Sequence, residues 1–303
     1  MAKARIIVKR RKAVRNIRKI TKVMQMISTS RYQKAYKRAV GTKPYVKKIG
    51  ELVASAVQAV KSSGAPIDHP LLKEAPPGSA IGKVAVLVIT SNRGLCGGYN
   101  GNLLRLANAT IKEIEATGQP VELHVAGKKG AAYFKFNRRE ITKNYGLIGE
   151  TPKYAEIEKV AEDFMKSYTE GVITRLKIVY MRFLSAGQQR SEVMDILPLS
   201  GLAGVEETAP SGEPASPAAA FDFMPAPHEL LKELIPTTVK IIIFQAFIEA
   251  AVSEQIARMV AMKAATDSAD KIGKKLTQEY NRARQSQITS ELSELMGGVE
   301  AMK

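Results

Sequence analysis

The sequence predicts an α/β protein in which the two ends of the chain form a long antiparallel two-helix coiled coil and the middle forms an inserted α/β domain. Residues 237–296 contain no proline and are far longer than an ordinary globular helix, and residues 4–60 indicate a second long helix. Between them, apolar segments of strand length alternate with amphipathic segments, which is typical of a layered domain with a mainly parallel sheet.

The first predicted helix, residues 4–60, has a heptad pattern near its beginning. Gly41 and Pro44 predict a kink or a short break, after which residues 51–60 resume an apolar rhythm. Apolar side chains spaced alternately by four and three residues predict the row that faces the partner helix. These residues are Ala13, Ile17, Ile20, Met24 and Ile27.

The middle of the chain begins with a Pro- and Gly-rich loop over residues 62–82. The segment 83–90 (KVAVLVIT) is continuously apolar and predicts a strand buried on both faces of a sheet. Further strands are predicted at 121–125, 176–184 and 192–197, and helices at 101–116, 131–136 and 154–169.

These elements divide the chain into four parts. The prediction is an N-terminal coiled-coil helix over 1–60, an α/β domain over 61–202, a linker over 203–236 and a C-terminal coiled-coil helix over 237–303. The linker is predicted to be flexible because it is rich in Pro, Ala, Gly and Ser.

The final helix has an unusual contact row. Charged residues such as Lys240, Glu249 and Glu254 interrupt its apolar beginning, so a membrane span is not expected. Instead, small and polar residues stand where Leu or Ile would give the most stable coiled coil, followed by an apolar tip around 288–296. The row after Ile248 is Ala251, Gln255, Met262, Thr266, Ala269, Gly273, Leu276, Tyr280, Ala283 and Gln287, with Met259 or Arg258 filling the gap before Met262.

The charge is concentrated at the N-terminus. The chain has a net charge of +17, and residues 1–50 contain 17 Lys or Arg and no Asp or Glu. Such a block predicts an acidic protein surface, nucleic acid or anionic lipid as the partner. A basic coiled-coil nucleic-acid-binding protein is therefore an alternative, but the heptad pattern and the few aromatic residues favour a protein-facing coiled coil.

No catalytic, cofactor-binding or metal-binding residue is predicted. The glycine-rich segment 91–102 follows a strand, but neither it nor 127–130 has the spacing of a nucleotide-binding loop, so a tight turn is favoured over a nucleotide-dependent enzyme. The three histidines lack metal-ligand spacing, and the single Cys96 excludes an internal disulfide. The first 30 residues have no apolar signal segment, so we expect the chain in the cytoplasm or its equivalent.

Four segments together resemble the gamma subunit family of F-type ATP synthase. They occur in the family's order and cover both end helices and the intervening domain. They are 9–38 (KRRKAVRNIRKITKVMQMISTSRYQKAYKR), 91–100 (SNRGLCGGYN), 253–269 (SEQIARMVAMKAATDSA) and 280–292 (YNRARQSQITSEL).

The resemblance implies a central rotary stalk that couples proton-driven rotation to ATP synthesis on the beta subunits. It implies a left-handed coiled coil inside a ring of three alpha and three beta subunits, with a Rossmann-like domain against the epsilon subunit and the c-subunit ring. One copy per complex, no active site or cofactor of its own, no nucleic acid and membrane contact only through the c-ring are expected. The location implied is the cytoplasmic face of the bacterial inner membrane, or its organelle equivalent, as a peripheral subunit.

The resemblance also implies contact residues and shows departures. Asn92 replaces an Asp of the family motif, segments 224–227 and 297–300 differ from the usual pattern, and 206–220 resembles an insertion. Residues that resemble the family's contacts with beta-subunit loops are Met24, Arg258, Arg284, Gln285, Thr289 and Glu291.

Overall fold

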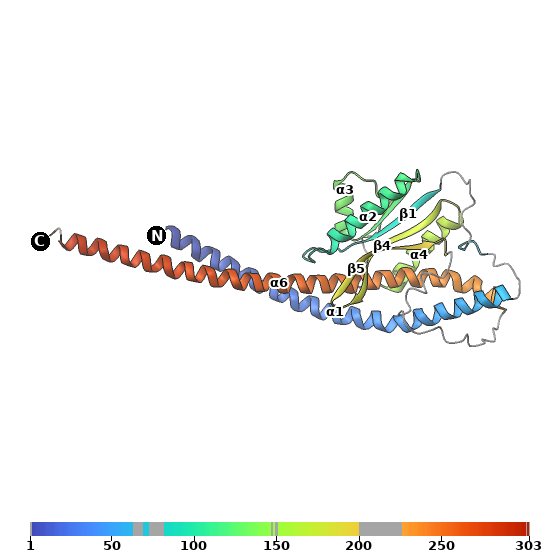
Figure 1. Cartoon of the computed structure of the whole chain (residues 1–303), viewed down its shortest axis with the longest axis horizontal. Helices are drawn as coiled ribbons and strands as arrows, with labels where there is room; N and C mark the ends of the chain where they lie inside the picture. The colour runs from blue at the N-terminus through green and yellow to red at the C-terminus, as the bar shows by residue number, and fades with distance from the viewer. Residues whose placement is uncertain are drawn as a thin grey trace. The chain divides into compact units, whose positions relative to one another are not determined.

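The computed structural model describes residues 2–62, 69–72, 82–146, 148, 151–199, 226–300 and 302. It confirms the predicted fold class, with a long helix at each end of the chain and an α/β domain between them (Figure 1). The elements are α1 (Ala2–Ser62), β1 (Lys83–Ile89), α2 (Tyr99–Ala116), β2 (Val121–Ala126), α3 (Lys128–Phe136), β3 (Lys143–Asn144), α4 (Tyr154–Thr169), β4 (Ile173–Ser185), β5 (Gln188–Leu197) and α6 (Pro227–Glu300).

The chain divides into two compact units, and both long helices contribute to each of them. The coiled-coil unit consists of Met1–Ser30 and Arg258–Lys303, and the α/β unit consists of Arg31–Ala257. This division differs from the predicted boundaries, which placed each end helix wholly in the coiled coil.

Within the coiled-coil unit, α1 and α6 run antiparallel. Arg18 is paired with Asp270, and the hydroxyl group of Thr266 lies 2.8 Å from that of Thr21. Because residue numbers rise along one helix as they fall along the other, the two helices point in opposite directions, as the sequence predicted.

The α6 contact row in this unit agrees with its predicted spacing. The row alternates steps of four and three residues, which is the heptad spacing of a coiled coil. Met262, Thr266, Ala269 and Leu276 are buried, and Gly273, Tyr280, Ala283 and Gln287 are half-buried.

The predicted α1 contact row is wrong. Ile17 and Ile20 are 52% and 59% exposed, and Ala13 and Ile27 are exposed as well, while Met24 is only half-buried. The row that faces α6 is shifted by one residue toward the C-terminus relative to the predicted row. The contact row of α6 consists largely of small and polar residues, and these accept small and polar neighbours. The α1 row comprises Ile7, Arg11, Val14, Thr21 and Ser28.

The α/β unit contains a five-stranded sheet with the order β3-β2-β1-β4-β5. The first four of these strands are parallel, and β5 is antiparallel to β4. A parallel order of 3-2-1-4 is that of a doubly wound dinucleotide-binding fold, so the domain is Rossmann-like. The two-residue strand β3 was not predicted, because Lys143 and Asn144 have no apolar pattern.

Both faces of the sheet are covered, as the apolar sequence of β1 predicted. On one face, Val86 of β1 packs in a core cluster with Leu103 and Ile111 of α2. On the other face, Leu87 belongs to a cluster with Phe164 of α4, Val53 of α1 and further residues of α6. The cluster on this second face anchors both long helices, and a third, smaller cluster joins Ala39 of α1 to Phe183 of β4 and Val252 of α6.

Two prolines lie inside helices. Helix α1 continues through Pro44, so the predicted break is absent there. Helix α6 begins at Pro227 rather than near Thr237 and includes Pro236. The buried side chains of Ile235 and Val239 lie on either side of Pro236, and their packing favours a continuous helix despite the missing backbone donor. Residues 200–225, which include most of the predicted linker and the 206–220 segment, lie outside the described residues.

Helix α6 is long and apolar enough to cross a membrane by composition alone, but 72% of its most apolar window is buried inside the protein. The core helix of a folded protein has this property, so the apolar stretch is accounted for by packing in the α/β unit.

Candidate partner-binding surface

The six residues implied as partner contacts all belong to the coiled-coil unit. The structure brings four of them together on neighbouring turns near the C-terminal end of α6, where their side chains are exposed. Met24 and Arg258 lie elsewhere, since 26 residues of helix, or about 39 Å, separate Arg258 from Arg284. The four grouped residues are Arg284, Gln285, Thr289 and Glu291.

The C-terminal end of α6 extends beyond the beginning of α1. Arg11 lies over the ring of Tyr280, at 4.8 Å from its centre. In an antiparallel pair, Ala2 is then level with about residue 289 of α6, since both helices rise by about 1.5 Å per residue. Figure 1 shows this end of α6 without a helix beside it, and every described side chain from Ile288 to Val299 is exposed.

An apolar stripe runs along this unpaired end. Helical geometry places Arg284 and Glu291 along one border of the stripe and Gln285 and Thr289 along the other. An exposed apolar surface with polar borders is typical of a protein-binding site. The stripe consists of Ile288 (50% exposed), Leu292 (57%), Leu295 (69%), Met296 (65%) and Val299 (60%).

Local hydrogen bonds orient the polar borders. The hydroxyl group of Thr289 donates to the carbonyl of Gln285 at 3.0 Å. The side-chain amide of Gln287 donates to the carboxylate of Glu291 at 2.7 Å. These bonds within one helix hold the polar atoms close to the helix surface and leave the apolar stripe uncovered.

Met24 lies between two different rows of α1. The buried residues Thr21 and Ser28 are on one side of it, and the exposed apolar residues Ile20 and Ile27 are on the other. Since the exposed row also includes Ile17, α1 presents a second apolar surface next to its contact with α6. The prediction had placed this row inside the coiled coil.

Arg258 is only 5% exposed and therefore lies below the surface of this chain. A direct contact between its guanidinium group and another subunit stays a prediction. The residues near the C-terminus of α6 are better placed for such contacts, because they are exposed without any rearrangement.

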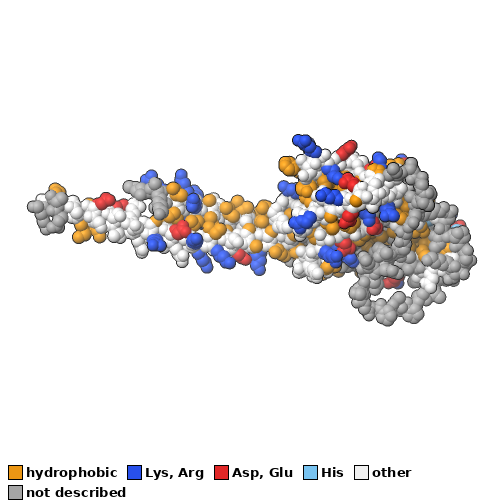
Figure 2. Space-filling view, turned by 45° about the horizontal axis from the view of Figure 1, so that its top comes forward, with side chains coloured by type: hydrophobic (Ala, Val, Ile, Leu, Met, Phe, Trp, Pro, Cys, Tyr) orange, Lys and Arg blue, Asp and Glu red, His pale blue; other side chains and the backbone are white. Residues whose placement is uncertain are grey.

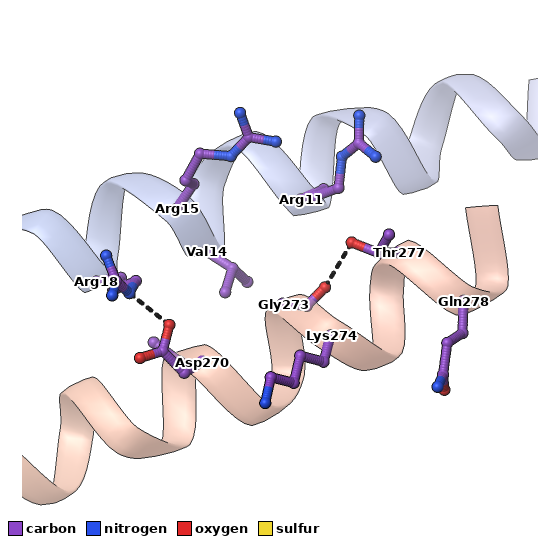
Figure 3. Close-up of a pocket in the computed structure, with 10 residues that line it drawn as sticks. Arg11, Val14, Arg15, Arg18, Asp270, Gly273, Lys274, Thr277 and Gln278 are labelled. Carbon is purple, nitrogen blue, oxygen red and sulfur yellow. Dashed lines mark hydrogen bonds and ion pairs between the residues drawn. The ribbon is translucent and has the colours of Figure 1, made fainter. Parts of the chain in front are cut away.

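A groove in the coiled-coil unit was not predicted. It has a volume of about 470 Å³ and opens where Gly273 has no side chain opposite Val14. Figure 3 shows Arg18 reaching Asp270 across it and the hydroxyl group of Thr277 bonded to the carbonyl of Gly273. The sequence feature that could have indicated this groove is Gly273, the glycine in the contact row of α6. The remaining lining residues are Arg11, Arg15, Ala269, Lys274 and Gln278.

The surface around this groove is strongly basic. Residues 1–30 contain ten Lys or Arg and no Asp or Glu. Figure 2 shows Lys and Arg side chains next to apolar ones along the coiled-coil unit. A surface of this kind attracts acidic partner segments over a range of about 10 Å at moderate ionic strength.

The glycine-rich segment after β1 forms a turn closed by its own side chains. The amide of Asn100 accepts a hydrogen bond from the backbone of Ser91 at 3.1 Å and donates to the Ser91 hydroxyl group at 2.7 Å. Asn92 accepts from the backbone N–H of Lys128 and donates to the carbonyl of Ile148, both at 3.1 Å. Hydrogen bonds therefore join the turn to Lys128 at the beginning of α3 and to Ile148, which precedes α4 in the sequence.

This turn lies at the carboxyl ends of the parallel strands, where Rossmann-type folds bind nucleotides. Here α6 occupies the position, since Phe247 and Ala250 line a cavity of only about 20 Å³ next to Thr90 and Gly127. The hydroxyl group of Tyr99 donates to the carbonyl of Ala250 at 3.2 Å. Ligand pockets usually need about 300 Å³ or more, so this space suits helix packing rather than a nucleotide.

Two long terminal helices, antiparallel in the coiled-coil unit, and a Rossmann-like domain inserted between them in the sequence define the fold class of this chain. The fold is similar to a chain of the Euglena gracilis mitochondrial ATP synthase OSCP/F1/c-ring structure, with a TM-score of 0.63, 18% identity and coverage of 99% of this chain and 95% of that one. It is also similar to a chain of the Tetrahymena thermophila central stalk and c-ring structure, with a TM-score of 0.53, 17% identity and coverage of 81% and 99%.

Sequence comparison identifies the family. The family model described as ATP synthase matches residues 3–302. The chain is 42% identical to the ATP synthase gamma chain of Rhodopirellula baltica over the full length of both proteins, and 39% identical to that of Leptospira biflexa, again over both full lengths. The chain belongs to the ATP synthase gamma chain family.

Proposed function

We propose that this chain is the central rotary stalk of an F-type proton-transporting ATP synthase and couples rotation of the c-ring to ATP synthesis on the beta subunits. The observation that carries the proposal is the full-length match to gamma chains together with the unpaired, apolar tip of α6. The chain itself has no active site in this proposal. It transmits torque, and the catalytic sites belong to other subunits.

The cross-section of the coiled-coil unit supports this role. A shaft surrounded by three copies of one catalytic subunit must present a different surface to each of them. The unit has an apolar row with Ile17 and Ile20, a basic groove around Gly273 and a single-helix tip, so its sides differ chemically. Rotation would therefore change the contacts of each partner in turn.

The proposed partners are three alpha subunits, three beta subunits, epsilon and the c-ring, with one copy of this chain per complex. The basic surface supports acidic partner loops, and no observation favours the alternative of a nucleic-acid-binding protein. The proposed location is the cytoplasmic face of the bacterial inner membrane, or the organelle equivalent, with membrane contact only through the c-ring.

Within this proposal, Arg284, Gln285, Thr289 and Glu291 contact beta-subunit loops from the borders of the apolar tip. Met24 contacts the same subunits from the edge of the exposed α1 row, and Arg258 would do so only where a partner opens its surroundings. Their exposure supports the first four most directly.

Co-expression with alpha and beta subunits tests the proposal. We expect a complex with one copy of this chain and three copies each of alpha and beta, measured by native mass spectrometry. The isolated chain, freed of beta subunit, should show no ATP hydrolysis. Salt-sensitive binding to DNA without assembly with alpha and beta would contradict the proposal and favour the alternative.

A further inference from the structure

Helix α3 and the turn after it form a basic and aromatic surface that the proposed rotary function does not use. The segment from Lys128 to Arg139 (KKGAAYFKFNRR) contains five Lys or Arg, three aromatic residues and no Asp or Glu. It belongs to the α/β unit, so this surface is separate from the coiled-coil unit described above.

The inner face of α3 is fixed firmly on the sheet. Phe134 is fully buried, and the backbone N–H of Gly130 donates to the hydroxyl group of Thr90 at 2.9 Å. A Cβ atom at Gly130 would lie only 2.7 Å from that hydroxyl oxygen, so glycine allows the close approach. The Asn92 side chain accepts a hydrogen bond from the backbone N–H of Lys128, the first residue of the helix.

Neighbouring helix α2 fixes two outer residues. Arg139 donates twice to the carboxylate of Glu115, at 2.7 and 2.9 Å. The amide of Asn108 donates to the hydroxyl group of Tyr133 at 3.0 Å. These bonds join α3 and the turn after it to α2, so the backbone that carries the other cations is anchored on both sides.

The other cations of this surface are not neutralised within the described part of the chain. Lys128, Lys129, Lys135 and Arg138 make no ion pair with a described residue. Lys128 and Lys135 are seven residues apart and so lie on the same face of α3. Four cations on one short segment without an ion-pair partner among the described residues favour a partner that supplies carboxylates or other anions.

An apolar contact point stands among these cations. Phe136 is 86% exposed at the end of α3, and Arg138 has a φ of 54° in the turn that follows. Arg138 also lines a shallow hollow of about 510 Å³, together with Lys135, Glu140 and Ile141. Aromatic side chains are enriched in protein–protein contacts, so the exposed ring of Phe136 suits contact with an apolar side chain of a partner protein.

We propose that this face, comprising Lys128, Lys129, Lys135, Phe136 and Arg138, binds a carboxylate-rich segment of another subunit in the assembled complex. An apolar side chain of that segment would cover Phe136, and its carboxylates would pair with the lysines. The hollow favours a protein segment over a flat anionic membrane, because a bilayer surface cannot fill a concave site. The inference depends on the proposed assembly into an ATP synthase.

Site-specific crosslinking in the purified, fully assembled complex tests this inference. Phe136→benzoylphenylalanine carries the photoreactive probe, and the same probe at Lys159, an exposed position on α4, is the matched control. We expect the probe at 136 to form a crosslink to one subunit, mapped by mass spectrometry to a segment rich in Asp and Glu. The control at 159 should not give that product.

Charge reversal supplies the second measurement. Lys128→Glu combined with Lys135→Glu should reduce the crosslink yield at position 136 at least about fivefold, whereas Lys159→Glu should leave it unchanged. Circular dichroism and thermal melting of each variant check that the fold is intact, and Lys128→Gln with Lys135→Gln should give an intermediate yield. High salt should lower the yield in the parent complex.

Three results would overturn the inference. They are an assembled complex without a crosslink at 136, a crosslink only to lipid or nucleic acid, and a yield insensitive to charge reversal. Failure of the parent chain to assemble with alpha and beta subunits is a different result from these three. It would overturn the proposed function and, with it, the role of this surface.

Discussion

The hydroxyl groups of Thr21 on α1 and Thr266 on α6 form a buried hydrogen bond of 2.8 Å between the two antiparallel helices. Each hydroxyl group also lies within hydrogen-bond distance of a carbonyl in its own helix, of Arg18 and Met262 respectively. The coiled coil is thus joined at this level by a polar contact between small side chains. Such a contact gives less stability than a pair of leucines but specifies which faces meet.

A double-mutant cycle should detect this contact. Thr21→Val and Thr266→Val each remove one hydroxyl group and should destabilise the chain by about 1 kcal/mol, while the double variant should cost less than the sum. Urea unfolding followed by circular dichroism measures the coupling. Thr277→Val, at an exposed position on α6, is the control. Strict additivity of the two buried substitutions would show that the hydrogen bond contributes nothing.

Met24→Lys should assemble normally but couple poorly. Because Met24 is half-buried at the edge of the exposed α1 row, a lysine there can extend outward along that row toward a beta-subunit carboxylate. About 1 kcal/mol of extra attraction in one rotary state slows escape from it roughly fivefold. Membrane vesicles should show ATP hydrolysis with reduced proton pumping.

Met26→Lys is the matched control for that experiment, because Met26 is 59% exposed and already surrounded by solvent. It should have a smaller effect. If Met24→Lys and parent vesicles pump the same number of protons per ATP hydrolysed, Met24 has a purely structural role.

The apolar tip of α6 predicts a separation between assembly and stability. Leu292→Asp with Leu295→Asp should leave thermal unfolding of the isolated chain within about 0.5 kcal/mol of the parent, since both side chains are exposed. The same variant should lose affinity for the alpha–beta ring, measured by co-purification. Ser293→Asp adds one negative charge outside the stripe, where the double variant adds two within it, and should retain binding. Normal binding by the double variant would be incompatible with a partner at the tip.

Asn92→Asp tests the departure from the family motif. An aspartate can still accept the N–H of Lys128, but it cannot donate to the carbonyl of Ile148. We expect a destabilisation of about 1 kcal/mol, partly offset by the negative charge at the beginning of α3. Asn102→Asp is the control, because Asn102 accepts a hydrogen bond from Arg105 and an aspartate can do the same. Urea unfolding that is unchanged by Asn92→Asp would show that the donated bond is unimportant.

His124 predicts a loss of stability in mild acid. Burial lowers the pKa of His124 below its usual value of 6.5, and the nearby carboxylate of Glu122 opposes this shift only in part. The unfolded chain therefore binds a proton more readily, so stability should fall as the pH decreases through about 6.5 toward the folded pKa. His124 packs edge-on against Phe164, with ring centres 4.7 Å apart, and its two ring nitrogens lie near the Glu122 carboxylate and the Tyr145 hydroxyl group.

Thermal melting at a series of pH values from 8 to 5 measures how stability depends on pH, because histidine titrates in roughly this range. His124→Phe should flatten the profile in that range, whereas replacement of the exposed His228 by Gln should not. An unchanged profile in His124→Phe would assign the acid sensitivity to other groups.

The sequence by itself determined the elements whose pattern is strong and local. The predicted bounds of α4 match the structure at both ends, and the spacing of the α6 contact row from Met262 to Gln287 is correct throughout. The buried strand β1 was predicted to within one residue. In each case the apolar residues recur regularly enough to define which face of the helix or strand is buried. A shift of that face by one residue would expose apolar side chains or bury charged ones.

The short spacing of Arg284, Gln285, Thr289 and Glu291 along one helix follows from the sequence, but their exposure was known only from the structure. The burial of Arg258 did not follow, because a side chain's exposure depends on which segments pack against it. The basic groove at Gly273 was likewise invisible, since it requires α1 and α6 together.

Only the tertiary structure decided which row of α1 meets α6. The row with Ile17 and Ile20 is the more apolar one, yet the row with Thr21 and Ser28 is buried. Hydrophobic periodicity sets the spacing of a contact row but not its phase when two rows of one helix compete. The phase depends on the partner helix, whose small residues accept close neighbours. The same dependence on packing keeps Pro44 and Pro236 inside continuous helices.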